Sequence, residues 1–320
     1  MVSLAITVLN EVDNLPRWLS CILAQSLLPD EIIIVDGGSN DGTWEWLQDQ
    51  AQKNKRLNVF KHVGNIALGR NFAIGQAKGE IIVVTDAGCV YRSNWLKDLV
   101  APLFFSGAKF STTAFAPWLE KSDGLLSYLI AASTVPAASE FKKDWLPSSR
   151  SVAFYKKLWQ DVGGYPEWIP ICEDVIFDLE IKKKGANLAF VRECLVCWRP
   201  RTSLRTYFTQ LFRYTRSDGH GNLWLHRQLI RYVTYLFVLV LLFLSVYFSP
   251  LILLLIFGGA LIYMKKFWLR WLEFSIDLRA INRVVGFFLM PLVVGWGDVA
   301  KMCGWPVGVL QRLTGKVLPI

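Results

Sequence analysis

The first 90 residues alternate between two kinds of hydrophobic pattern. Residues 2–9, 32–35, 57–60 and 80–85 are short apolar runs, which are typical of buried strands. Residues 14–25, 44–52 and 69–77 lie between them and are predicted to be helices; the first has apolar side chains at the spacing of one helical face. Strands that alternate with helices predict an α/β fold with a parallel sheet, in which ligands bind beyond the carboxyl ends of the strands.

The pattern is less regular between residues 96 and 198. A helix is expected before Pro102, and a second helix is expected over residues 175–184, where lysines fill the last turn and Gly185 follows. Glu173 and Asp174 come directly before this second helix. Its amino end is therefore predicted to present two carboxylates.

The last third of the chain contains two long apolar runs, residues 232–248 and 251–264, separated by a Ser-Pro turn. A single helix of about 33 residues would be about 50 Å long, whereas the hydrocarbon core of a bilayer is about 30 Å thick. We therefore predict a helical hairpin over about residues 230–266, and the shorter second run leaves a shallow re-entrant hairpin open. A third stretch, about residues 283–303, is predicted to be an interfacial helix or a third membrane helix.

Composition and charge support a membrane-bound protein with two parts. The hydrophobic share is 53% and the mean hydropathy is +0.32, with the excess after residue 232. The net charge of +9 is concentrated near the apolar segments, which favours membrane lipid over nucleic acid as a partner. Basic residues flank both outer ends of the hairpin, which predicts that the first part faces the cytoplasm. We predict a first domain over residues 1–228 and a membrane-associated region over residues 229–320.

Acidic residues at predicted strand ends suggest a sugar-transfer site. Transfer of a sugar from a nucleotide needs a binding site for the nucleoside, a cation that neutralises the leaving diphosphate and a base that deprotonates the acceptor hydroxyl. Asp36 can accept a hydrogen bond from a base or a ribose, Asp86 can bind a divalent ion, and Asp174 opens a helix. Each of these aspartates on its own also fits a helix cap or a turn.

The order of the polar motifs is similar to that of the family-2 glycosyltransferases, which have the GT-A fold. The resemblance covers about residues 2–216 and implies a mostly parallel, Rossmann-like sheet with helices on both faces, followed here by the hydrophobic membrane helices. The motifs are Thr7-Val-Leu-Asn-Glu11, Val35-Asp-Gly-Gly-Ser-Asn-Asp-Gly-Thr43, Gly69-Arg-Asn-Phe-Ala73, Thr85-Asp-Ala-Gly88, Gly163-Gly-Tyr165 and Glu173-Asp174.

The resemblance also implies roles for individual residues. It implies an inverting transfer from a nucleotide-sugar donor, with Asp174 as the general base and Glu173 beside it. The residues implied to bind the donor are Asn10, Glu11, Asp36, Arg70, Asp86 and Ala87.

The metal motif departs from the family pattern. The family has a second carboxylate two residues after the first, whereas this chain has Gly88 there. Asp86 together with diphosphate oxygens and waters can still bind Mg²⁺ or Mn²⁺, so a divalent cation is expected. His220, in the glycine-rich stretch Ser217-Asp-Gly-His-Gly221, is either a further metal ligand or a solvated loop histidine.

The segment from Gln210 to Tyr214 resembles the Gln-x-x-Arg-Trp segment of processive membrane members of the family. Gln210, Arg213 and Tyr214 are therefore implied to contact the acceptor or the leaving diphosphate, although the segment also fits an amphipathic helix on the bilayer. The chain has few membrane helices, which favours a single addition to a lipid-linked or membrane-proximal glycan acceptor in cell-envelope or polysaccharide synthesis. A polyprenyl-phosphate sugar synthase and a catalytically silent nucleotide-binding subunit of a membrane complex are the alternatives.

Overall fold

The computed structural model describes residues 1–141 and 145–315, and the chain divides into two compact units. The first unit comprises Met1–Trp118 and Ala138–Arg199, and the second comprises Leu119–Ala137 and Pro200–Ile320. The division falls at residue 199, not at residue 228, because the helix that follows residue 203 packs on the last helix of the chain. Each unit is therefore described by itself.

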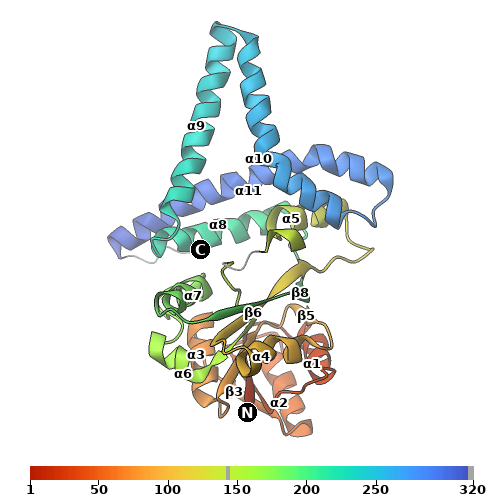
Figure 1. The fold of residues 1–320 in the computed structure, drawn as a ribbon, viewed down its shortest axis with the longest axis vertical. Helices are drawn as coiled ribbons and strands as arrows, with labels where there is room; N and C mark the ends of the chain where they lie inside the picture. Colours follow the sequence, from red (N-terminus) through yellow and green to blue (C-terminus); the bar gives the residue numbers. More distant parts are fainter. Residues whose placement is uncertain (142–144, 316–320) are drawn as a thin grey trace. The chain divides into compact units, whose positions relative to one another are not determined.

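The first half of the first unit is a parallel βα array, as the hydrophobic pattern predicts (Figure 1). The four strands pair in parallel in the order β3-β2-β1-β4. The elements are β1 (Val2–Val8), α1 (Leu15–Leu23), β2 (Glu31–Asp36), α2 (Thr43–Lys53), β3 (Leu57–Lys61), α3 (Ile66–Gln76) and β4 (Ile81–Thr85).

The second half extends the sheet to eight strands in the order β3-β2-β1-β4-β7-β6-β8-β5. β7 runs antiparallel to β4 and β6, and β5 runs antiparallel to β8, so the sheet is mixed. Of these four strands, the sequence pattern did not predict β5, β6 or β7, whereas a strand was expected at residues 193–198, the end of β8. The elements are β5 (Cys89–Tyr91), α4 (Trp95–Phe105), β6 (Phe110–Pro117), a 3₁₀ turn (Ala138–Glu140), β7 (Ser151–Tyr155), α6 (Lys156–Val162), α7 (Glu173–Lys183) and β8 (Leu188–Trp198).

The central strands are apolar throughout because both faces of the sheet are covered. Leu4 and Ile6 of β1 belong to a core cluster with α1 and α4, whereas Ala5 between them belongs to a cluster with α3 and α7. Alternate side chains of a strand point to opposite faces, so a strand buried on both faces has no polar alternation. The helix expected before Pro102 includes this proline, contrary to the prediction. Pro102 lies in the last turn, where a missing N–H removes only one helical hydrogen bond.

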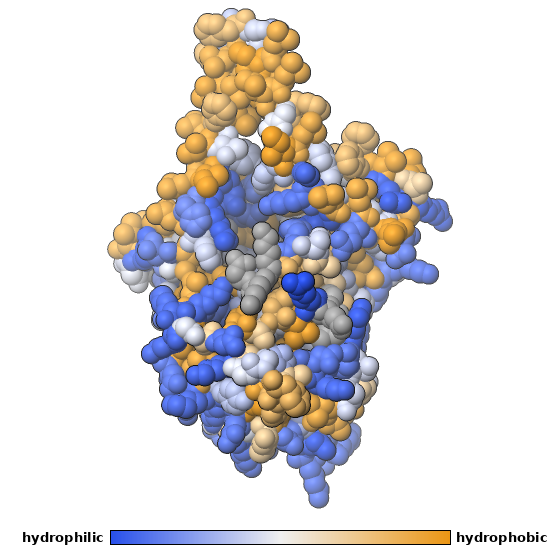
Figure 2. Space-filling view, viewed as in Figure 1, coloured by the Kyte–Doolittle hydropathy of each residue, from blue (hydrophilic) through white to orange (hydrophobic). Residues whose placement is uncertain are grey.

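The second unit is helical, and its described residues include three helices that are long and apolar enough to cross a membrane. α9 and α10 form a hairpin, and α8 and α11 run across its base (Figure 1). The hairpin is covered with apolar side chains (Figure 2). The elements are α5 (Leu125–Thr134), α8 (Leu204–His220), α9 (Leu225–Tyr247), a 3₁₀ turn (Pro250–Ile252), α10 (Leu253–Phe274) and α11 (Ala280–Thr314).

Two of the membrane helices are longer than the sequence pattern suggested. α10 has 22 residues because the helix continues through Lys265 and Lys266, where the apolar run ends. α11 has 35 residues, compared with the stretch of about 283–303 that was expected. The two arms of the hairpin are α9 and α10, and both are long enough for a full crossing.

A buried carboxylate joins the three membrane helices. The Asp298 side chain of α11 is 1% exposed and lies 3.4 Å from Arg231 Nε of α9 and 3.3 Å from Lys301 Nζ of α11. Its Oδ2 accepts hydrogen bonds from the hydroxyls of Tyr235 on α9 and Tyr263 on α10. Because a charge is costly in an apolar environment unless it is paired, this cluster holds the three helices in one arrangement.

Glycines allow α8 and α11 to approach closely. An added Cβ at Gly308 of α11 would lie 1.8 Å from the Arg216 carbonyl oxygen of α8, and one at Gly219 of α8 would lie 2.3 Å from the Trp305 carbonyl oxygen. Arg216 Nε also donates a hydrogen bond of 3.0 Å to Gln311 Oε1. The glycine-rich stretch around His220, which was expected to be a loop, is therefore the last turn of α8, where glycine serves helix packing.

Gly308→Ala is expected to destabilise the second unit by about 1–3 kcal/mol, because the added methyl group meets backbone and the two helices must separate. Gly295→Ala on the same helix is the matched control, since nothing lies within 4 Å of its added Cβ. That change is expected to be neutral or to stabilise by up to about 1 kcal/mol through helix propensity. Thermal unfolding in detergent measures both, and equal midpoints for the two variants would contradict the close packing.

Candidate active site

Two acidic residues mark one edge of the parallel half of the sheet. Asp36 is the last residue of β2, and Asp86 comes directly after β4. β1 lies between these strands, so their ends are separated by two strand spacings, which is about 10 Å. A nucleoside diphosphate is long enough to span such a separation.

Asp36 is fully buried and has one carboxylate oxygen without a hydrogen-bond partner. Its Oδ1 accepts hydrogen bonds from the backbone N–H of Ser39 at 3.0 Å and from its hydroxyl at 2.5 Å. Oδ2 accepts none from the residues that the structure describes. Leaving a buried acceptor unpaired costs about 1–3 kcal/mol, so a ligand N–H or O–H there would be favourable.

The loop after β1 contacts the loop that follows Asp36. Asn10 has a left-handed backbone with φ of 56°, its N–H donates to Ser39 Oγ at 2.8 Å, and its Oδ1 accepts from the N–H of Asn40 at 2.9 Å. The N–H of Glu11 donates to Thr43 Oγ1 at 2.9 Å. The structure thus brings Asn10 and Glu11 beside the polar loop between β2 and α2.

Arg70 joins Asp86 to the start of α7. Its side chain is 3% exposed, its Nη2 lies 2.8 Å from Asp86 Oδ1, and its Nη1 pairs with Glu173 Oε1. Burial lowers the pKa of the Arg70 guanidinium, but the charges of Asp86 and Glu173 outweigh burial and raise its pKa overall. Arg70 is therefore a permanent cation at this edge of the sheet.

The start of α7 presents one buried carboxylate and one accessible carboxylate. Cys172 has a left-handed backbone with φ of 67° and turns the chain into the helix. Glu173 is buried, and burial raises the pKa of its carboxyl while the Arg70 cation opposes that rise. Asp174 is half-buried, and its Oδ1 accepts a hydrogen bond of 2.9 Å from the N–H of Val175. Asp174 is the carboxylate of this pair that a substrate hydroxyl can reach.

The sequence patterns missed a second arginine at this edge. Thr85 of β4 pairs with Ser151 of the antiparallel β7, so Arg150 lies directly across from Asp86. Arg150 Nε is 3.8 Å from Asp86 Oδ2, and the guanidinium lies 4.8 Å from the Trp198 ring. The only signal in the sequence is a polar Ser148-Ser149-Arg150 before an apolar run, and it becomes meaningful once β7 is known to run antiparallel.

The first part of the chain matches a known family. Residues 3–118 match the family described as Glycosyl transferase family 2. This segment spans β1 to β6 and includes Asp36, Arg70 and Asp86. Residues 3–118 are therefore a family-2 glycosyltransferase domain.

Relatives of this glycosyltransferase come from an archaeon and a bacterium. It is 24% identical over 214 residues to Glycosyltransferase AglE of Haloferax volcanii, a match that covers 61% of this chain and 66% of the relative. It is 26% identical over 232 residues to Succinoglycan biosynthesis protein ExoA of Rhizobium meliloti, a match that covers 67% of each chain. The matches thus span about two thirds of the relatives' own length.

A solved structure shares the fold of the glycosyltransferase. This is the mannosyltransferase PcManGT from Pyrobaculum calidifontis in complex with GDP-Man and Mn²⁺, with a TM-score of 0.56 and 16% sequence identity. The alignment covers 99% of this chain and 88% of the mannosyltransferase. The GT-A fold implied by the motifs is therefore confirmed.

The remaining predicted site residues are Ala87 in the first unit and four residues of the second unit. Ala87 is buried beside Asp86. Gln210 Nε2 donates a hydrogen bond of 3.1 Å to the Tyr214 hydroxyl on α8. Since Gln210, Arg213, Tyr214 and His220 belong to the second unit, their roles at the donor site stay predictions.

Proposed function

We propose that this family-2 glycosyltransferase is an inverting enzyme that moves a sugar, of hexose type, from a nucleotide-sugar to a membrane-proximal or lipid-linked acceptor. The main support is the contact of Arg70 with both Asp86 and Glu173. This contact brings a strand-end carboxylate, a permanent cation and the start of α7 with Asp174 together, at the sheet edge where Asp36 also ends its strand.

The donor is proposed to lie across the ends of β2, β1 and β4. The unpaired oxygen of Asp36 would accept a hydrogen bond from the base or the ribose, and Asn10 and Glu11 would hold the loop around it. The diphosphate would lie near Asp86, where Arg70 and Arg150 supply positive charge. The backbone at Ala87 lies beside the same position.

A divalent cation fits this site only as part of the donor complex. Within residues 1–141 and 145–315, no group of three or more His, Cys, Asp or Glu side chains is arranged to hold a metal ion. The Asp86 side chain is 28% exposed and offers a hard oxygen ligand of the kind that Mg²⁺ and Mn²⁺ prefer. Bound there with diphosphate oxygens and water, the ion would neutralise negative charge on the leaving group. The mannosyltransferase of similar fold holds Mn²⁺ together with GDP-Man.

The proposed chemistry is a single displacement. Asp174 removes the proton of the acceptor hydroxyl, and the resulting oxygen attacks the anomeric carbon of the donor sugar. The bond from this carbon to the diphosphate breaks on the opposite face, which inverts the configuration. Glu173 does not take the proton, because its oxygen is paired with Arg70.

The acceptor is proposed to be a glycan at the membrane. Three helices of the second unit are long and apolar enough to cross a bilayer, and the basic residues at the outer ends of the hairpin favour a cytoplasmic catalytic unit. One relative is named for succinoglycan biosynthesis. Arg213 is exposed on α8 and, with Gln210 and Tyr214, is proposed to meet the acceptor or the diphosphate.

The donor is identified by binding measurements on the full chain in detergent with UDP-, GDP- and dTDP-sugars, with and without Mn²⁺. One nucleotide class is expected to bind, and Asp36→Ala is expected to weaken that binding by about 10- to 100-fold, the value of a hydrogen bond to a charged group. Asp49→Ala, an exposed aspartate on α2, is the control and is expected to leave binding unchanged.

Transfer is then assayed with a glycan acceptor and with a polyprenyl phosphate as separate arms. Product with the polyprenyl phosphate alone would favour the synthase alternative. The absence of binding by all nucleotide-sugars, or full affinity in Asp36→Ala, would contradict the proposed donor site.

A further inference from the structure

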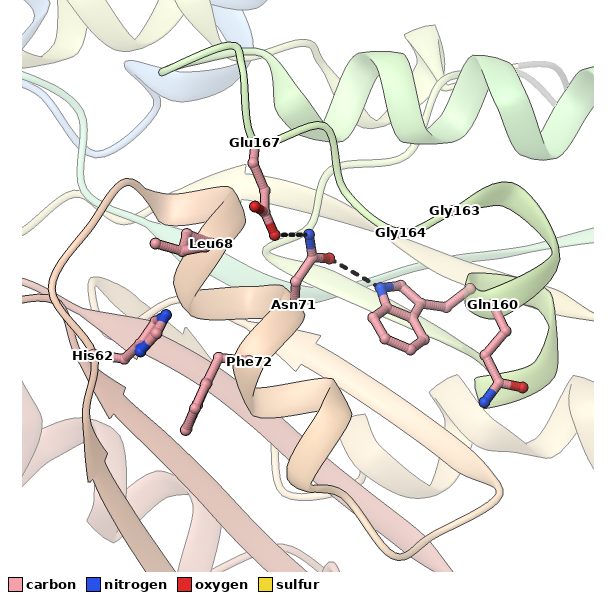
Figure 3. A pocket seen from close by; sticks show the side chains of 9 residues that line it. His62, Leu68, Asn71, Phe72, Gln160, Gly163, Gly164 and Glu167 are labelled. Carbon is pink, nitrogen blue, oxygen red and sulfur yellow. Dashed lines mark hydrogen bonds between the residues drawn. The ribbon is translucent and has the colours of Figure 1, made fainter.

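Asn71 forms a hydrogen-bonded bridge between α3 and the loop that precedes α7. Its Nδ2 donates to the Tyr165 carbonyl oxygen at 2.8 Å and to Glu167 Oε1 at 2.9 Å. Its Oδ1 accepts from the N–H of Tyr165 at 2.8 Å and from Trp159 Nε1 at 3.0 Å. Four bonds exhaust the hydrogen-bonding capacity of an asparagine side chain. Asn71 and Glu167 both line a pocket of about 550 Å³, and Figure 3 shows the hydrogen bond between their side chains.

The bridged loop has a backbone that few residues can adopt. Gly163 and Gly164 have φ of 83° and 79°, and an added Cβ at Gly164 would lie 2.9 Å from Asn71 Oδ1. Asn65, the cap of α3, donates a further hydrogen bond of 2.6 Å to the Glu167 carbonyl oxygen. The motifs Gly69-Arg-Asn and Gly163-Gly-Tyr are therefore two sides of one contact.

This contact reaches the proposed catalytic residues through Tyr165. Its ring is buried, stacks on Phe177 of α7 at 4.2 Å and lies 5.5 Å from the guanidinium of Arg70. Phe177 is three residues after Asp174, which places the two side chains on neighbouring positions of the same helix. Movement of Tyr165 would therefore shift the start of α7 relative to α3.

We propose that Asn71 is a positioning residue for sugar transfer. Its bridge holds the start of α7, with Asp174, at a fixed place relative to Arg70 and Asp86. The proposal rests on the proposed function of Asp174. A displacement of about 1 Å in a catalytic group can lower a rate by about 100-fold, so a residue that touches no substrate can control the chemical step.

The test reverses one hydrogen bond of the bridge. Asn71→Asp keeps an acceptor for Tyr165 and Trp159, but it removes both donors and places a carboxylate next to that of Glu167. Glu167→Gln alone keeps an oxygen that accepts from Asn71, so it is the matched control. In the double variant, the new amide donates to the new carboxylate and the bond is restored with its direction reversed.

Asn71→Asp is expected to lower kcat by about 10- to 100-fold while donor affinity stays within about twofold. Glu167→Gln is expected to be close to wild type. The double variant is expected to recover part of the lost kcat, because it restores the bond to residue 167 but not the bond to the Tyr165 carbonyl oxygen. The rate of amide hydrogen exchange in residues 163–174 reports on the Asn71 bridge in the absence of substrate. It is expected to become faster in Asn71→Asp and to slow again in the double variant.

Unchanged exchange in Asn71→Asp, an equal fall of kcat and donor affinity, or a double variant no better than Asn71→Asp would overturn the positioning role. Failure of the proposed base is a separate result. It would appear as transfer that persists in Asp174→Asn, and it would leave the exchange measurements unaffected.

Discussion

Asp174→Asn is expected to abolish measurable sugar transfer while the nucleotide-sugar still binds. The substitution keeps the shape of the side chain and an oxygen that accepts the hydrogen bond from Val175, so the start of α7 should stay in place. It removes the group that takes the proton of the acceptor hydroxyl, and the loss of a general base lowers rates by about 10²- to 10⁴-fold. Transfer is measured as product formed per enzyme, and donor affinity is measured by calorimetry on the same preparation.

Asp161→Asn makes the same chemical change at an exposed position of the same unit and serves as the control, since Asp161 pairs with Lys157 on the surface. It should transfer sugar at the wild-type rate. Transfer by Asp174→Asn at a comparable rate would remove Asp174 as the base. A simultaneous loss of donor binding would mean that Asp174 binds the donor and does not act on the acceptor.

Arg70→Ala is expected to lower the free energy of unfolding of the first unit by about 3–5 kcal/mol and to abolish transfer. Removing one partner of a buried ion pair leaves its charge uncompensated, and Arg70 has two carboxylate partners, Asp86 and Glu173. Arg70→Lys keeps the charge but loses the planar group that reaches both carboxylates at once, so it should recover part of the stability and little of the activity.

Arg92→Ala is the control, because this arginine is exposed in the same unit and its loss should change stability by less than about 0.5 kcal/mol. Denaturant unfolding measures all three variants. Wild-type stability in Arg70→Ala would show that the two carboxylates do not depend on this cation.

The first half of the catalytic unit was predictable because its signals are local. Strands buried on both faces are apolar runs, such as Ile32–Val35 within β2, and a glycine-rich turn over residues 37–42 separates β2 from α2. Asp36 and Asp86 were identifiable because polar residues after apolar strands meet at one edge of a parallel sheet.

The second half of the sheet was not predictable in this way. β7 lies between β4 and β6, and β6 pairs in parallel with β8, which begins at Leu188. Such pairings join residues far apart in the sequence, and no periodicity within a short window reports them. The same reason explains why Arg150 was missed, because it faces Asp86 only through the antiparallel register of β7.

Pattern and composition alone therefore determined the class of the chain: a parallel βα array with acidic strand ends, followed by apolar helices in a hairpin. These features depend on neighbours within one element, where burial sets the spacing of apolar residues. Tertiary structure alone decided which charges meet, since the pairing of Arg70 with Asp86 and Glu173 and the bridge of Asn71 to Tyr165 each join separate elements. Such contacts depend on distances across the fold, and the order of residues along the chain does not fix those distances.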